Sequence, residues 1–360
     1  MSDRRCGLGA LGGALACGLL LSAGGCGSTP EPAPSRSASQ PMVDRPTGEV
    51  PDTVERSQLR ELALDTLIDA ASDENPGVRA NAVEALAMAP TRLESILPVV
   101  LADDNLVVRT VACLTVGRSR RCDLVPLVEP LTNDSSAYVR TAALYAMARC
   151  GYEVDLSPIA AMLFNSPTTR ERAHAAFVLG ELNDPTAIPM LRQAASLDVP
   201  RASDIELKIL QLQIAEALFK LGDSSQLHTV QAALFPSRSE DLEATALAVQ
   251  IIGEIGARQS INDLTNLAIQ SDEAGNPMPA EIRLAVAGSL AKLGRRDGWF
   301  VAEELWESEN PQLRAQSAYV LGMTRYPEHL PILGELMGDS DPVVRVSAAA
   351  ATTRIVGQAR

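Results

Sequence analysis

The sequence predicts an all-α fold, a right-handed α-solenoid (superhelix) of about nine helical hairpins. Three observations support this prediction. Hydrophobic residues make up 46% of the chain but aromatic residues only 3%, and this Ala-, Leu- and Val-rich composition suits closely packed helices. One pattern, Asp-x-x-Pro-x-Val-Arg-x-x-Ala-x-x-x-Leu, recurs with variations along residues 57–357. Since neither helix of such a unit buries its apolar face alone, neighbouring units must stack.

A recurring arginine position defines the repeat unit. The equivalent positions are residues 79, 109, 140, 172, 211, 245, 283, 314 and 345. The second helix of each unit is expected to start near this position and often to end at glycine. The predicted stops are Gly151, Gly180, Gly222, Gly294 and Gly322. Stacked at roughly 9–10 Å per layer, the hairpins give a superhelix about 80–90 Å long.

The unit resembles the HEAT repeat, especially its short HEAT-like form, although cores of about 31 residues are shorter than typical HEAT units. The resemblance covers about 300 residues of the chain. It implies that Asp and Arg side chains form a structural ladder between adjacent repeats. The residues of this ladder are Asp73, Arg79, Asp103, Arg109, Asp134, Arg140, Arg172, Arg314, Asp339 and Arg345. The alternative is a row of arginines that binds an anionic ligand.

The N-terminal part differs from the repeats. Residues 1–25 combine a short positive start, an uncharged Gly-, Ala- and Leu-rich stretch and small residues before Cys26, as in a secretory signal. This arrangement resembles the lipobox of bacterial lipoproteins, although Ala23 stands where Leu is usual. The resemblance implies lipidation of Cys26 and anchoring to a membrane of the cell envelope, on the outer-membrane or periplasmic side. Plain secretion and an uncleaved anchor are the alternatives. Residues 26–52 read as a disordered Pro- and Ser-rich tether, and 53–360 as the solenoid.

Charge and motif content bound the function. The formal net charge is −14, so the chain lacks the basic surface that nucleic acid binding needs. A basic or neutral protein or peptide partner is favoured instead. His174, His228 and His329 fall in three different repeats, and no Cys pair has metal-ligand spacing. No nucleophile or phosphate-loop motif occurs in the repeats. We therefore expect that the protein is a monomer, that it binds no metal or cofactor, and that it is not an enzyme.

The cysteines of the repeats are informative. Cys113 lies within an apolar helix stretch and is expected to be buried. Cys122 precedes the first helix of the third repeat, and Cys150 ends its second helix. Because these two ends meet in an antiparallel helix pair, a Cys122–Cys150 disulfide is predicted outside the cytoplasm, with two free thiols as the alternative. The aromatic residues within 299–306 are interpreted as core packing or as an exposed anchor for a partner.

Repeats 5, 6 and 7 carry longer loops at about residues 196–206, 236–242 and 271–281. Equivalent loops of stacked repeats share one edge, so these insertions are expected to form a contiguous acidic lip. The residues of the acidic lip are Asp198, Arg201, Asp204, Glu240, Asp241, Asp272, Glu273 and Glu281. We expect a non-catalytic scaffold or adaptor that binds a partner through this lip and the adjacent concave face. The alternatives are tolerated surface insertions on a purely structural spacer, a lyase-like HEAT enzyme acting on a prosthetic group, and a cytoplasmic regulatory repeat protein.

Overall fold

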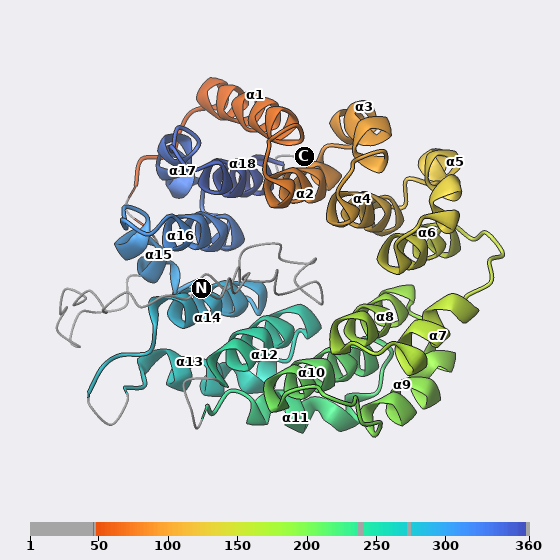
Figure 1. Ribbon diagram of the computed structural model, residues 1–360. Coiled ribbons are helices and arrows are strands. Elements are labelled where there is room, and N and C mark those ends of the chain that lie inside the picture. The colour runs from red at the N-terminus through yellow and green to blue at the C-terminus, as the bar shows by residue number, and fades with distance from the viewer. Residues whose placement is uncertain (1–45, 47, 237–240, 272–274, 358–360) are drawn as a thin grey trace, which may run out of the picture.

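A computed structural model describes residues 46, 48–236, 241–271 and 275–357. Within these residues, eighteen α-helices follow one another as nine hairpins, and there is no β-strand (Figure 1). The predicted all-α solenoid of about nine hairpins is confirmed. The predicted lipidation of Cys26 and the predicted signal before it lie outside the described residues.

The first helix of each hairpin lies on the outside of the assembly (Figure 1). These outer helices are α1 (Thr53–Ala70), α3 (Pro90–Leu101), α5 (Val125–Val128), α7 (Ser157–Asn165), α9 (Ile188–Ala195), α11 (Leu227–Ala232), α13 (Ile261–Ile269), α15 (Trp299–Leu305) and α17 (Leu330–Leu336). Short 3-10 segments accompany several of them, at Leu86–Met88, Cys122–Leu124, Glu129–Asn133, Pro185–Ala187, Ser224–Gln226, Arg258–Ser260 and Pro327–His329.

The second helices form the inner layer, where each packs against the second helix of the neighbouring hairpin. These inner helices are α2 (Pro76–Ala85), α4 (Leu106–Ser119), α6 (Ala137–Arg149), α8 (Thr169–Leu182), α10 (Asp204–Lys220), α12 (Leu242–Ile255), α14 (Ala280–Lys292), α16 (Pro311–Thr324) and α18 (Pro342–Val356). Fully buried alanines such as Ala112, Ala175 and Ala248 allow this close approach.

Capping side chains fix where several inner helices begin. The Asn75, Asn105 and Asn310 side chains each accept a hydrogen bond from the second residue of the helix that follows, and Asp341 does the same for α18. Such caps satisfy backbone N–H groups that have no partner within the helix. Proline stands in the first turn of α2, α16 and α18, where no N–H is required.

Two of the predicted glycine stops are wrong. Gly180 and Gly322 lie inside α8 and α16, where the next inner helix passes very close. A Cβ at Gly180 would lie 2.8 Å from the Cα of Ala217, and one at Gly322 would lie 2.5 Å from the Cβ of Ala351. These glycines therefore serve helix packing rather than helix termination. The other three predicted stops do follow a helix with positive φ: Gly151, Gly222 and Gly294.

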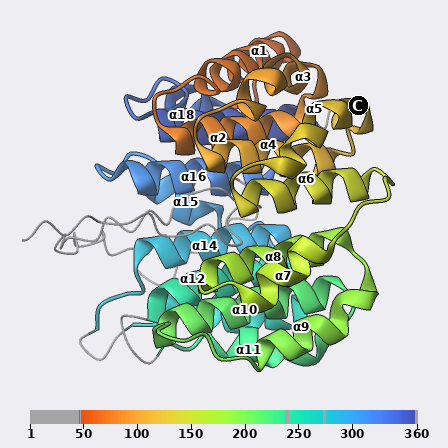
Figure 2. The same cartoon turned by 45° about the vertical axis from the view of Figure 1, so that its right-hand side comes forward.

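The two ends of the solenoid meet and close a ring. Helix α1 packs against α18, and α18 also contacts α2 while α16 covers its other side (Figures 1 and 2). The expectation of a superhelix 80–90 Å long is wrong for this reason, since an extended stack would hold α1 and α18 at opposite ends. Leu64 and Leu67 of α1 are 2% and 0% exposed, so the closing helix buries leucine side chains. In the described part of the chain, no helix has the length and apolar character needed to cross a membrane.

Candidate functional site

The Asp–Arg pairs link neighbouring repeats. Arg79 donates two hydrogen bonds to the carboxylate of Asp103, at 2.7 and 2.8 Å, and a third from Nη1 to its own loop at the carbonyl of Asp73, at 2.7 Å. The side chains of Arg79 and Asp103 are only 17% and 11% exposed. A two-pronged, partly buried pair of this kind holds a loop to the next loop more firmly than a surface ion pair.

We call one such Arg–Asp pair between neighbouring repeats a rung of the ladder. The same rung recurs at two further places and is missing at others. Arg109 pairs with Asp134, and Arg314 pairs with Asp339. Hydrogen bonds from Arg314 hold the pKa of Asp339 below its usual value. The guanidinium groups of Arg140, Arg172 and Arg345 donate instead to carbonyl groups of their own loops. The carboxylate of Asp73 accepts from the Asn75 N–H.

The cysteines lie as follows. A disulfide joins Cys122, in the 3-10 turn before α5, to Cys150, the C-cap of α6. It therefore ties together the two ends of one hairpin. Cys113 is a free thiol within α4, and burial raises the pKa of this thiol above its usual range. A buried thiol that stays protonated is a poor nucleophile, so Cys113 offers no reactive group.

The acidic lip is only partly exposed. Glu240, Asp272 and Glu273 lie outside the described residues. Asp198 and Arg201 are exposed between α9 and α10, and Asp204 is exposed at the first residue of α10. Glu281 is half-buried in the first turn of α14. These four residues stand where a partner has access to them.

Asp241 does not contribute an exposed carboxylate to the lip, contrary to the prediction. It is 5% exposed, and its Oδ1 accepts from the Lys208 ammonium at 2.7 Å. Lys208 is on α10 and Asp241 is the N-cap of α12, so this ion pair joins the starts of two neighbouring inner helices. The contact places the loops of repeats 5 and 6 beside each other.

The same loops carry a row of exposed apolar side chains that the sequence analysis did not identify. Leu197, Phe235 and Ile269 stand at or just beyond the C-terminal ends of α9, α11 and α13. They are 37%, 56% and 76% exposed. Successive outer helices run in the same direction, so their C-terminal ends share one edge of the ring. Figures 1 and 2 both show α9 and α11 side by side on the lower outer side. We call these three residues the apolar row.

The wall of the ring interior is charged. Seven charged residues and two methionines stand nine residues after the arginine-equivalent positions. These residues are Met88, Arg118, Arg149, Glu181, Lys220, Glu254, Lys292, Met323 and Arg354. The sequence could have revealed these residues, because a charged residue recurs at the same place in most of the inner helices and interrupts their apolar pattern.

Ion pairs connect these side chains across helices. Arg118 of α4 pairs with Glu84 of α2 at 3.2 Å and with Glu181 of α8 at 3.0 Å. Lys220 of α10 pairs with Glu181 at 2.7 Å, and Lys292 pairs with Glu254. Several charged side chains of the predicted concave face are therefore paired with one another across neighbouring helices.

Glu84 is a carboxyl of this interior with a strongly raised pKa. Burial raises the pKa of Glu84 to about 7, and the positive charge of Arg118 only partly opposes this effect. The phenyl ring of Phe177 lies between two cations, with Arg118 at 5.1 Å and Lys220 at 5.5 Å from its centroid. These contacts add to the packing that holds α4, α8 and α10 together.

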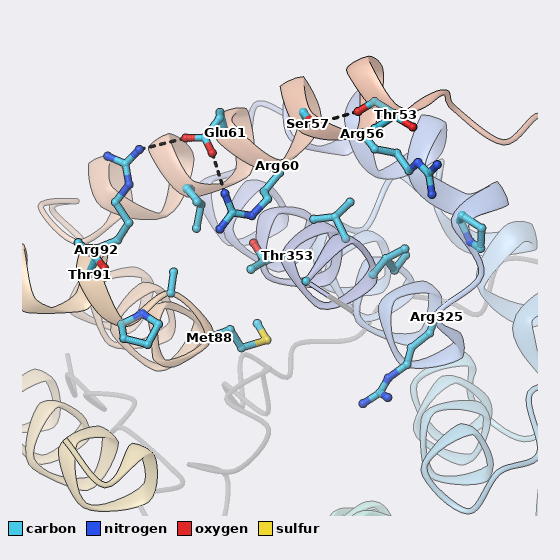
Figure 3. A pocket seen from close by; sticks show the side chains of 17 residues that line it. Thr53, Arg56, Ser57, Arg60, Glu61, Met88, Thr91, Arg92, Arg325 and Thr353 are labelled. Carbon is cyan, nitrogen blue, oxygen red and sulfur yellow. Dashed lines mark hydrogen bonds and ion pairs between the residues drawn. The ribbon is translucent and has the colours of Figure 1, made fainter. Parts of the chain in front are cut away.

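A pocket of about 980 Å³ lies where the ring closes (Figure 3). Its walls come from α1, from the start of α3, from the turn after α16 and from the end of α18. Arg56, Arg60, Arg92 and Arg325 line it, together with Glu61. Its walls thus come from both ends of the repeat array. We call it the seam pocket.

Comparison with known proteins agrees with the repeat architecture. A family model described as HEAT repeats matches residues 299–359, which span the last two hairpins, and supports a HEAT-repeat protein. A solved structure of human deoxyhypusine hydroxylase in complex with glycerol is 18% identical, covers 75% of this chain and 97% of that chain, and has a TM-score of 0.36. An engineered protein is 15% identical, with coverages of 84% and 95% and a TM-score of 0.33. Neither likeness carries an argument about activity. No curated protein matches the chain.

Proposed function

We propose that the protein is a non-catalytic, protein-binding scaffold tethered to the bacterial cell envelope through a lipid on Cys26. The apolar row is the binding surface of this proposal, and the acidic lip around it selects a basic or neutral segment. Its partner is an extended protein segment that crosses the loops of repeats 5, 6 and 7.

The observation that carries the proposal is the exposure of Leu197, Phe235 and Ile269 in three consecutive hairpins. Covering a fully exposed apolar side chain of this size stabilises a complex by about 1.5–3 kcal/mol. The contribution of each residue scales with the area that it still exposes, so Ile269 offers the most and Leu197 the least. A row of three at equivalent places provides the apolar anchors around which binding energy concentrates. Asp198 and Asp204 beside the row supply negative charge for steering a basic segment.

The ring interior supports the choice of the outer edge. Because Arg118, Glu181 and Lys220 bind one another there, a partner entering the interior would have to break paired, partly buried charges. Breaking such a pair leaves a charge without its partner, at a cost of several kcal/mol. A partner that binds at the outer edge of the ring does not need to break these ion pairs.

The test is affinity capture from envelope extracts after mild cross-linking. The bait is the full chain, compared with a triple variant in which Leu197, Phe235 and Ile269 are replaced by serine. We expect a partner that the full chain captures and the triple variant loses. A matched control replaces Leu62, Val99 and Leu127 by serine; these residues are 50%, 68% and 41% exposed on the outer helices of repeats 1–3.

The outcomes separate the alternatives. Loss of the partner only in the apolar-row variant supports the proposal and identifies the partner by mass spectrometry. Equal capture by the intact chain and both variants would sink it. The absence of any specific partner would favour the spacer. Loss only in the control variant would move the binding surface to the outer helices of repeats 1–3.

A further inference from the structure

The seam pocket concentrates positive charge in an acidic chain. The full sequence has a formal net charge of −14, yet the pocket is lined by four arginines against one glutamate (Figure 3). Arginines in a concave site bind anions well because the planar guanidinium group donates two parallel hydrogen bonds to a phosphate or carboxylate.

The arginine donors are accessible to a ligand. The Nε of Arg56 donates to the carbonyl of Asp52 at 3.3 Å, and no acidic side chain in the described part of the chain pairs with this arginine. Arg60 and Arg92 both pair with Glu61, at 2.8 and 3.1 Å, and Arg92 also lies 3.9 Å from the carboxylate of Asp65. These pairs are weak because the four side chains are 40–66% exposed, so a ligand with more negative charge competes for the two arginines.

The start of α3 adds a second feature that favours an anion. Helix α3 has twelve residues, its N-cap is Ala89, and no side chain caps it. Pro90 has no N–H, and the N–H groups of Arg92 and Leu93 donate to the Ala89 carbonyl. The uncapped first turn, at Thr91, therefore presents the positive end of the helix dipole to the pocket, an arrangement that suits phosphate.

We propose that the seam pocket binds a small polyanion that carries phosphate groups, and that this ligand fastens the two ends of the ring together. Arg56 and Arg60 of α1, Arg92 of α3 and the first turn of α3 hold the phosphate oxygens. The opposite wall, which includes Thr353 of α18, contacts the rest of the ligand. A volume of about 980 Å³ is within the range of sites for small molecules. The phosphate belongs to a soluble molecule or to a lipid headgroup, and the test distinguishes these two sources.

The test uses the full chain in mild detergent, with inorganic pyrophosphate as the soluble probe. We expect saturable binding by calorimetry, and slower hydrogen exchange in both α1 and α18 when pyrophosphate is added. The double variant Arg56→Gln, Arg92→Gln is expected to bind at least about tenfold more weakly, since hydrogen bonds to charged groups are the strong ones. The matched control is Arg120→Gln, Arg258→Gln, which changes two exposed arginines that do not line the pocket.

A second arm uses phosphatidylcholine vesicles with and without phosphatidic acid. Weak pyrophosphate binding, together with phosphatidic acid-dependent vesicle binding that the double variant loses, assigns the phosphate to a lipid headgroup. If sodium chloride at equal ionic strength reproduces the pyrophosphate effect, or if intact chain and double variant behave alike in both arms, the proposal is overturned. The exchange measurement in the intact chain keeps the test decisive even if the double variant folds poorly.

Discussion

Closure of the ring predicts that a mutation in the first helix destabilises the last one. Leu67 of α1 is 0% exposed, and α1 packs against α18. Replacing a fully buried leucine by alanine costs roughly 2–5 kcal/mol, because apolar contact is lost and a cavity remains. Taking about 3 kcal/mol as the loss in the docking of α1, and about 1.4 kcal/mol per factor of ten, Leu67→Ala raises the undocked population roughly a hundredfold.

The assay is hydrogen exchange followed by mass spectrometry. In Leu67→Ala, we expect peptides from both α1 and α18 to exchange faster by up to about a hundredfold, because α18 loses the cover on one side. The control is Leu163→Ala in α7, an equally buried leucine far along the chain, which should leave α18 unchanged. Faster exchange in α1 with unchanged exchange in α18 would contradict this coupling, since α18 would then owe its protection to α16 and α17 alone.

Three further predictions concern single contacts. Arg283 pairs with Glu304 at 3.5 Å. Ser308→Asp should replace this longer contact by a two-pronged rung from Arg283, twenty-five residues earlier as in two existing rungs, and raise the free energy of unfolding in urea by about 0.5–1 kcal/mol. An unchanged or lower value would contradict the role of the rungs. Reducing the Cys122–Cys150 bond opens a loop of 28 residues and so gives the unfolded chain more conformational freedom. The free energy of unfolding should therefore fall by about 3.5 kcal/mol in reducing buffer. An unchanged value would contradict a stabilising role for the disulfide. Because the pKa of Glu84 in the folded chain is raised to about 7, the folded chain binds the carboxyl proton of Glu84 more tightly than the unfolded chain does. The free energy of unfolding should therefore fall by up to about 3 kcal/mol as pH rises from about 4.5 through 7. A Glu84→Gln variant should lose this pH dependence, and an equal dependence in both proteins would exclude Glu84 as its source.

Local features of the fold were readable from the sequence. The Asp103 and Arg109 positions recur at a fixed spacing, and the caps and ion pairs that depend on this spacing are local or bridge adjacent repeats. The pairing of Cys122 with Cys150 could be proposed for the same reason, because both residues belong to one hairpin. Patterns of this kind need only the geometry of a hairpin and its neighbour.

Features that depend on the whole ring were not readable. Closure results from small rotations summed over nine hairpins, and no single repeat encodes that sum. Arg56 and Arg325 line one pocket although they are far apart in the chain, so no motif relates them. The glycines were misinterpreted because Gly180 and Gly322 look like helix ends in the sequence, whereas contact with the next helix determines their role. Asp241 was placed on the surface because its partner Lys208 belongs to another repeat.

The most direct test of the proposed scaffold function is site-specific photo-crosslinking from the apolar row. A photoreactive amino acid would replace Phe235, which is 56% exposed between α11 and α12, and in a parallel sample Val99, which is 68% exposed on α3. If the apolar row binds the partner, Phe235 should give one defined crosslinked protein in envelope preparations. This product should be absent from the Val99 sample and lost when Leu197 and Ile269 are also replaced by serine. No product from Phe235, or the same products from both positions, would contradict binding at the apolar row.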